Sequence, residues 1–235
     1  MADESAMYTA SPAFRRYAHR MVTSGPGAPG LGVQLPSALA ELRDDRVEPY
    51  GLRLYLKRDD LIHPEVPGNK WRKLRYNLVA AREHGHSRLL TFGGAFSNHI
   101  RAVAAAGDHL GFETVGVIRG EKHEPLNESL AYAVSRGMRL TYVDRSTYRR
   151  KADPAVVAAL VDEFGPCYVV PEGGSNARGV QGCVELPAEI DTGFDVICCA
   201  CGTGGTLAGI AAGLQEDTER AVSVQIGRAS CRERV

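Results

Sequence analysis

The chain is predicted to adopt an α/β fold built on open parallel sheets. From Leu52 onward, short strand-like runs alternate with helix-like segments, which is the pattern of a parallel sheet with crossover helices. Val196–Cys201 is a continuous apolar run, as expected for a parallel strand covered on both faces. Three glycine-rich loops follow predicted strands, and in open α/β folds such loops line the ligand cleft.

The predicted strands share short runs of aliphatic, aromatic and threonine residues bounded by turn residues. In chain order they are Leu52–Lys57, Arg88–Phe92, Thr114–Arg119, Leu140–Val143, Tyr168–Pro171, Val196–Cys201 and Ala221–Val224. The first fifty residues contain Gly25-Pro26-Gly27 and Pro29-Gly30, and we expect them to form an irregular wrapping segment.

The predicted helices show apolar residues at helical spacing or recognisable ends. Trp71, Leu74, Leu78 and Ala81 share one face of the first helix. Ser97 and Asn98 are N-cap candidates for the second, Gly137 ends the third, and Pro154 begins the fourth. The predicted helices are Lys70–Glu83, Ser97–Leu110, Asn127–Arg136, Pro154–Phe164, 178–190 and Thr206–Leu214.

The overall composition indicates a globular protein. The 235 residues are 44% hydrophobic and 24% charged, with a formal net charge of +0, so we expect neither a nucleic-acid nor a membrane partner. The sequence contains no apolar run long enough to span a membrane, and its first residues lack a compact apolar segment with a cleavage site, so we expect no secretory signal and a cytoplasmic protein. Three of the six cysteines lie in Cys198–Cys201, and without a second cluster they predict reduced, buried cysteines rather than a metal site.

The last ten residues, Ile226–Val235, are expected not to belong to the natural protein. They read IGRASCRERV, a peptide that a common sequencing adapter encodes; the alternative is a genuine basic tail. We therefore expect Cys231 and the tail arginines to carry no function. We also expect the natural chain to continue past about Gln225, which would leave one domain incomplete.

Two lysines at a helix start form the first candidate site. Lys70 follows Gly68-Asn69, and Lys73 shares its helical face three residues later. A buried Lys70 would have a lowered pKa and could hold an aldehyde cofactor as a Schiff base, while Lys73 could contact a phosphate. The alternative is two exposed lysines beside Arg72 and Arg75.

The loop after the strand Arg88–Phe92 is the second candidate. Gly93-Gly94 precede Ser97-Asn98-His99, whose N–H groups would form an anion site at the helix start. Their side chains would add a hydroxyl, an amide and an imidazole at one point. A simply capped helix is the alternative.

The third candidate is a phosphate-binding loop. Gly202, Thr203, Gly204, Gly205 and Thr206 follow an apolar strand and open a helix, but the P-loop lysine and the dinucleotide-binding spacing are missing. Two other strand ends are less specific. Pro171–Asn176 either lines the cleft or forms an ordinary turn with an N-cap, and Asp59-Asp60 is interpreted as a turn and cap rather than a catalytic pair.

These motifs together resemble the 1-aminocyclopropane-1-carboxylate deaminase and D-cysteine desulfhydrase family of fold-type II pyridoxal-phosphate (PLP) enzymes, which are tryptophan synthase β-like. The matching stretches are LYLKRDDL, GNKWRKLRYNL, LLTFGGAFSNHIRAVAAAG, PEGGSN and CGTGGTLAGI, in family order over Leu52–Leu214.

The resemblance implies a role for each motif. It implies Lys70 as the Schiff-base lysine, Asn98 as a ligand of the cofactor's phenolic oxygen and Ser97 near the substrate, with Asn98 and His99 also binding substrate. It places Gly202–Thr206, together with Lys73, on the phosphate. Deaminases tend to have Gln where this chain has His99, which favours a desulfhydrase-like relative or an uncharacterised one.

The expected architecture has two open parallel-sheet domains. Residues 1–75 and 171–225 would form an incomplete large domain that binds PLP, and residues 76–170 a small α/β domain. The expected function is a PLP-dependent lyase that converts a small amino acid to ammonia and an oxoacid, with no metal. The full-length protein is expected to be a homodimer. The alternatives are a racemase or β-replacement enzyme of the same fold, or a PLP-binding protein without turnover.

Overall fold

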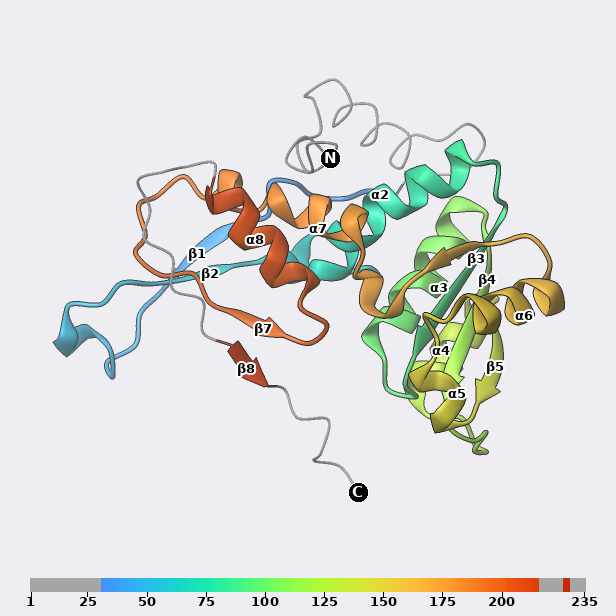
Figure 1. Cartoon of the computed structure of the whole chain (residues 1–235). Helices are drawn as coiled ribbons and strands as arrows, with labels where there is room; N and C mark the ends of the chain where they lie inside the picture. The colour runs from blue at the N-terminus through green and yellow to red at the C-terminus, as the bar shows by residue number, and fades with distance from the viewer. Residues whose placement is uncertain (1–30, 216–225, 229–235) are drawn as a thin grey trace.

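The computed structural model describes residues 31–215 and 226–228. Figure 1 shows two parts side by side: a sheet of strands β3 to β6 with its helices, and a second part that contains α2, α7 and α8 with two strand pairs. Among the described residues, no helix has the length and apolar character needed to cross a membrane.

The first part is a four-stranded parallel sheet, as predicted. Its strands are β3 (Arg88–Gly93), β4 (Glu113–Arg119), β5 (Arg139–Val143) and β6 (Tyr168–Val170), in the order β5-β4-β3-β6. All three strand pairs are parallel. The carboxyl ends of β3 and β6 therefore meet at one edge, where their loops can form a common site.

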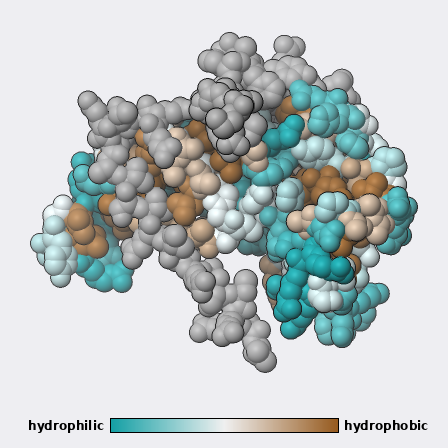
Figure 2. Space-filling model, in the orientation of Figure 1, coloured by the Kyte–Doolittle hydropathy of each residue, from teal (hydrophilic) through white to brown (hydrophobic). Residues whose placement is uncertain are grey.

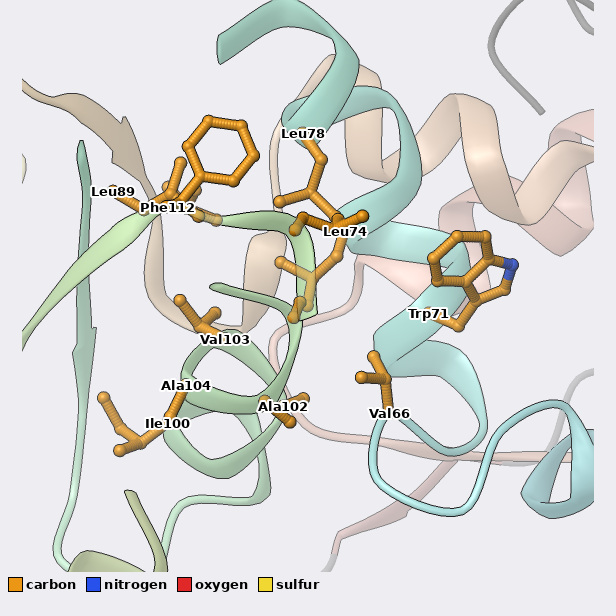
Figure 3. Packing of buried hydrophobic residues seen from close by; sticks show 14 of the residues in the cluster. Val66, Trp71, Leu74, Leu78, Leu89, Ile100, Ala102, Val103, Ala104 and Phe112 are labelled. Carbon is orange, nitrogen blue, oxygen red and sulfur yellow. The ribbon is translucent and has the colours of Figure 1, made fainter. Parts of the chain in front are cut away.

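Helices cover both faces of this sheet. On one face, α3 (Asn98–Leu110) and α4 (Glu128–Ser135) share a core with α2 (Asn69–Glu83), and Figure 3 shows Leu74 and Leu78 of α2 in this cluster together with Ile100 and Val103 of α3. On the other face, α5 (Arg145–Arg149) and α6 (Pro154–Phe164) cover a second core. The short helix α5 was not predicted; the Asp144 carboxylate caps it by accepting from two backbone N–H groups.

The second part is a layer of three closely packed helices, α2, α7 (Ala177–Val184) and α8 (Gly205–Gln215). The backbones approach through glycine, since a Cβ built on Gly182 of α7 would lie 1.9 Å from the Arg72 carbonyl oxygen of α2. Helix α7 is shorter than the predicted 178–190, because the chain turns after Val184 into a 3-10 helix that begins at Pro187.

One strand pair corrects the expected layout of the N-terminal region. β1 (Leu39–Leu42) pairs antiparallel with β2 (Leu54–Lys57), so this part of the first fifty residues is not irregular and this pair is not parallel. A four-residue strand is defined by its partner, which local sequence does not reveal. Leu42, Leu54 and Leu56 are 41–44% exposed, and Figure 2 shows hydrophobic residues at the surface of this region.

The second strand pair is β7 (Cys199–Cys201) with β8 (Ile226–Arg228), which are parallel. β7 is shorter than the predicted buried strand, with Val196 52% exposed and Cys198 exposed, because β8 pairs with only three of its residues. β8 consists of the first three residues of the segment expected to be a non-native tail, and the origin of that segment stays a prediction. Ala221–Val224 and Cys231 lie outside the described residues.

Candidate functional site

The two candidate lysines lie on one face of α2, directly after a constrained turn. Gly68 has φ 64°, a left-handed value that favours glycine, and its N–H donates to the Asp59 carbonyl oxygen at 2.7 Å. Lys70 follows in the first turn of α2. Lys73, one turn later, is only 2% exposed, so the alternative of two exposed lysines is wrong.

Lys70 lines a pocket of about 330 Å³. The lining residues are Pro64, Glu65, Pro67, Asn69, Lys70, Asn98, Arg101 and Tyr132. Burial, together with the nearby charge of Lys73, lowers the pKa of Lys70 to about 8. Roughly a tenth of Lys70 is therefore a neutral, nucleophilic amine at pH 7, far more than at the ordinary pKa, and this is the form that reacts with an aldehyde.

Three of the other lining residues, Glu65, Arg101 and Tyr132, belong to a connected set of polar side chains. The Arg101 guanidinium lies over the Tyr132 ring, 4.3 Å from its centroid, and the Tyr132 hydroxyl donates to Glu65 at 2.7 Å. Glu65 also pairs with His109 at 2.6 Å and with Arg136. Because these partners neutralise Glu65, the pocket keeps the positive charges of Lys70 and Arg101 and favours an anionic ligand.

The loop after β3 caps α3 and presents Asn98 to the pocket. The Ser97 hydroxyl accepts from the Ile100 N–H at 3.3 Å, so Ser97 is the N-cap, and the Ser97 N–H donates to the Gly94 carbonyl at 3.1 Å. The predicted anion site therefore loses the Ser97 N–H. The N–H groups of Asn98 and His99 remain at the start of α3, where the helix dipole favours an anion.

The expectation that the side chains of Ser97, Asn98 and His99 meet at one point was wrong for His99. Its imidazole is 3% exposed, and its Nε2 lies 2.9 Å from the Thr91 hydroxyl oxygen, while that hydroxyl donates to the Val170 carbonyl at 2.8 Å. Nε2 must therefore carry the proton in this pair. Burial first, and then Lys70 and Lys73, lower the pKa of His99 to about 3, so the side chain is neutral.

The glycine loop Gly202–Thr206 forms a cup between β7 and α8, and Lys73 points to it. Lys73 Nζ lies 3.3 Å from Ser175 Oγ and 3.4 Å from Thr203 Oγ1. A Cβ built on Gly202 or Gly204 would meet nothing within 4 Å among the described residues, so the loop backbone is open to a ligand. An ammonium, two hydroxyls and a helix start converge here, which fits a phosphate group.

The two halves of the site are joined through α2. Asn69 lines the Lys70 pocket and also donates from its side chain to Thr206 in the cup at 2.8 Å. One ligand with a phosphate at the cup and a reactive carbon near Lys70 would use both halves. This fits PLP, which carries a phosphate and an aldehyde on one ring.

The loop Pro171–Asn176 serves both of the functions that were left open for it. Gly173 and Gly174 have φ of 66° and 67°, and a Cβ on Gly174 would lie 3.2 Å from Lys73 Cβ, so the loop packs directly against the site. Asn176 also caps α7, accepting from the Gly179 N–H at 2.8 Å.

Sequence reasoning missed Arg72, which is 2% exposed. Its guanidinium donates to both Asp59 oxygens at 2.7 Å and to Glu189 at 2.8 and 2.9 Å. Asp59 lies in the predicted turn, but its carboxylate binds Arg72 instead of capping a helix. The available signal was the acidic pair Asp59-Asp60 after a strand, followed by two arginines, Arg72 and Arg75, three residues apart on the next helix.

Comparisons with known proteins agree with this geometry. The family described as "Pyridoxal-phosphate dependent enzyme" matches residues 36–232. The D-cysteine desulfhydrase of Yersinia pestis is 36% identical over 182 residues, covering 71% of this chain and 54% of that protein. The bifunctional mitochondrial D-cysteine desulfhydrase/1-aminocyclopropane-1-carboxylate deaminase of Arabidopsis thaliana is 34% identical over 183 residues, covering 70% and 46%. The chain thus spans about half the length of the curated relatives it matches.

Solved structures point the same way. A crystal structure of an ACC deaminase homologue has a TM-score of 0.71 at 27% identity and covers 92% of this chain and 66% of its own. A PLP-dependent aspartate racemase, with a TM-score of 0.67 at 15% identity, shares the fold alone. The family match spans most of the described residues and includes every loop of the candidate site, and the chain accordingly belongs to the pyridoxal-phosphate dependent enzymes.

Proposed function

We propose that the protein is a PLP-dependent lyase that removes ammonia from a small amino acid and leaves an oxoacid. The observation that carries this proposal is Lys70, whose pKa is lowered to about 8 in a pocket joined through Asn69 to the Lys73 cup. A lysine amine that is partly neutral at physiological pH, with an anion site nearby, suits covalent capture of the cofactor aldehyde.

Each residue has an assigned task. Lys73, Ser175 and Thr203, with the loop Gly202–Thr206, would hold the phosphate, and Asn98 would contact the cofactor ring from the start of α3. Ser97 and the free N–H groups of α3 would bind the substrate carboxylate. When bound, the cofactor's pyridine ring accepts the electrons released at the substrate carbon.

Lys70 would also act on the substrate as the proton-transfer group. Its amine, neutral in part near pH 8, would remove the proton at the α-carbon of an amino acid, or at a ring β-carbon of a cyclopropane substrate. Partial burial in the pocket limits the hydration of this amine, and the neighbouring charged groups that shift its pKa are Lys73 and Cys183 rather than a carboxylate.

We expect a D-amino acid with a β-leaving group, such as D-cysteine, to be preferred over aminocyclopropane carboxylate. His99 supports this choice indirectly. Its neutral imidazole is fixed inside the protein behind Asn98, so it affects the substrate through the backbone of α3 rather than by its charge. The Yersinia pestis relative is named a D-cysteine desulfhydrase.

The test has two stages. Borohydride reduction of the PLP-loaded protein, followed by peptide mapping, should place the pyridoxyl group on Lys70; a label on another lysine would contradict the assignment. Comparing kcat/KM for D-cysteine and aminocyclopropane carboxylate then decides between the two substrates. Racemisation or β-replacement without release of ammonia would favour an alternative chemistry, and cofactor absorbance unchanged by every amino acid would favour a non-catalytic PLP-binding protein.

We further propose a cytoplasmic homodimer. The exposed leucines of β1 and β2 support self-association, since an apolar sheet face of this kind is usually covered. Light scattering coupled to size-exclusion chromatography measures the mass directly, and a monomer at micromolar concentration would contradict the dimer.

A further inference from the structure

A buried ion-pair cluster lies directly behind the two lysines of the site. Arg72 follows Lys70 by two residues, which places the two side chains about 200° apart around α2, on opposite sides of the helix. Lys70 faces the pocket, and Arg72 is buried between Asp59 and Glu189. Whatever holds Arg72 therefore fixes the back of the turn that carries Lys70.

Each charged group of the cluster has an oppositely charged partner. Arg72 makes two hydrogen bonds to each carboxylate, at 2.7–2.9 Å. Lys57 Nζ lies 3.0 Å from Glu189, and the Ser37 hydroxyl donates to Asp59 at 2.6 Å. Two cations, Arg72 and Lys57, balance two carboxylates, so the cluster has no net charge.

The same cluster reaches the turn in front of Lys70 through the backbone. The Asp59 carbonyl accepts the Gly68 N–H at 2.7 Å, while the Asp59 carboxylate binds Arg72. Asp59 thus holds α2 at two points, one before Lys70 and one after it. Glu189 connects this point to the segment that follows α7.

We propose that Arg72, held by Asp59 and Glu189, is a positioning residue that fixes the start of α2 and directs Lys70 into its pocket. The cluster also keeps two carboxylates occupied close to the site, so they do not pair with Lys70 or Lys73. The identity of Lys70 as the cofactor lysine rests on the proposed function, but the positioning itself concerns the amine alone and can be measured without cofactor.

The test measures the pKa of the Lys70 amine in cofactor-free protein, by competitive acetylation across pH 6–11 and mass spectrometry of its peptide. Arg72→Met should raise this pKa by about one unit, because a loosened helix start hydrates the amine and two carboxylates lose their main partner. Thermal unfolding is followed in parallel, so that loss of the whole fold is recognised.

Arg75→Met is the matched control. Arg75 lies one turn later on the same helix, is similarly buried and pairs with Glu185 at 2.7 Å, but it contacts neither Asp59 nor the turn before Lys70. This variant should lose stability while the Lys70 pKa stays within about 0.3 unit of wild type. Equal pKa values in Arg72→Met and Arg75→Met would overturn the proposal.

Arg72→Lys provides a second comparison if Arg72→Met does not fold. Lysine keeps the positive charge but cannot bind two carboxylates bidentately, so the Lys70 pKa should lie between those of wild type and Arg72→Met. A Lys70 pKa in Arg72→Lys equal to that of Arg75→Met would refute the positioning role. A pyridoxyl label on a lysine other than Lys70 would refute the proposed function and leave this result standing.

Discussion

The contact between α7 and α2 offers a quantitative test of the fold around the site. Gly182 of α7 lies against the backbone of Arg72, and an alanine Cβ there would be 1.9 Å from the Arg72 carbonyl oxygen and 2.8 Å from its carbonyl carbon. Ordinary Cβ contacts begin near 3.4 Å, so the helices must separate by about 1.5 Å to accept the methyl group.

The expected cost follows from two opposing terms. Overpacking a close contact costs about 1–3 kcal/mol, and the upper end applies here because the atom that is met belongs to a backbone and cannot rotate away. Alanine in place of glycine in a helix recovers at most about 1 kcal/mol. The net loss for Gly182→Ala is about 2 kcal/mol, or roughly 4–8 °C in Tm for a protein of this size.

Thermal unfolding followed by circular dichroism measures this loss. Gly193→Ala is the control, because a Cβ on Gly193 meets nothing within 4 Å and its Tm should move by less than about 2 °C. Gly182→Ala should also weaken PLP binding, since the displaced helix is the one that carries Lys70 and Lys73. A Gly182→Ala protein as stable as wild type would show that α2 and α7 are not packed as described.

Three further predictions concern a lysine charge, a helix cap and a buried hydrogen bond. The folded pKa of Lys70, about 8, lies below the ordinary 10.5, so between these pH values the unfolded chain binds more protons than the folded protein. Lys70→Met should therefore raise Tm at pH 7, and thermal melts should show this gain shrinking as the pH rises from 8 to 10.5. A gain that stays constant over this range would contradict the lowered pKa. Ser97→Ala removes the cap on the Ile100 N–H and should lower the free energy of unfolding, measured in urea, by about 1 kcal/mol. It should also lower kcat more than it lowers the affinity for PLP. A larger loss of PLP affinity than of kcat would contradict the assignment of Ser97 to the substrate. Thr91→Val leaves the buried His99 N–H without its acceptor and should cost about 1–3 kcal/mol in the same assay, and an unchanged midpoint would disprove that hydrogen bond.

The parallel sheet was predictable because several local signals agree. Each strand is a short apolar run, each is followed by a helix with its own cap, and the predicted bounds of β3 and β4 fall within one residue of those observed. Of the two N-cap candidates Ser97 and Asn98, Ser97 is the N-cap of α3, and Asn127, predicted as the first residue of its helix, is the N-cap of α4. Elements whose local signals agree in this way can be predicted without knowing which distant residues they contact.

The buried charges of α2 were not predictable, because their partners are remote in sequence. Arg72 meets Asp59 and Glu189, which lie 13 and 117 positions away, and Arg75 meets Glu185. A helix with so many charged residues is ordinarily a solvated one. Only tertiary packing shows that α7 and α8 pack against this helix and that each arginine forms an ion pair with a carboxylate.

The division of charge on α2 accounts for the position of the site. Of the four cations in its first two turns, Arg72 and Arg75 have carboxylate partners, whereas Lys70 and Lys73 have none within ion-pair distance among the described residues. Although burial opposes it, hydrogen bonding to Asp59 and Glu189 raises the pKa of Arg72, while burial lowers the pKa of both lysines. A buried ammonium at Lys73 and a half-buried one at Lys70, both without a counter-charge, are costly, and a ligand that brings a phosphate to Lys73 and an aldehyde to Lys70 would relieve both at once.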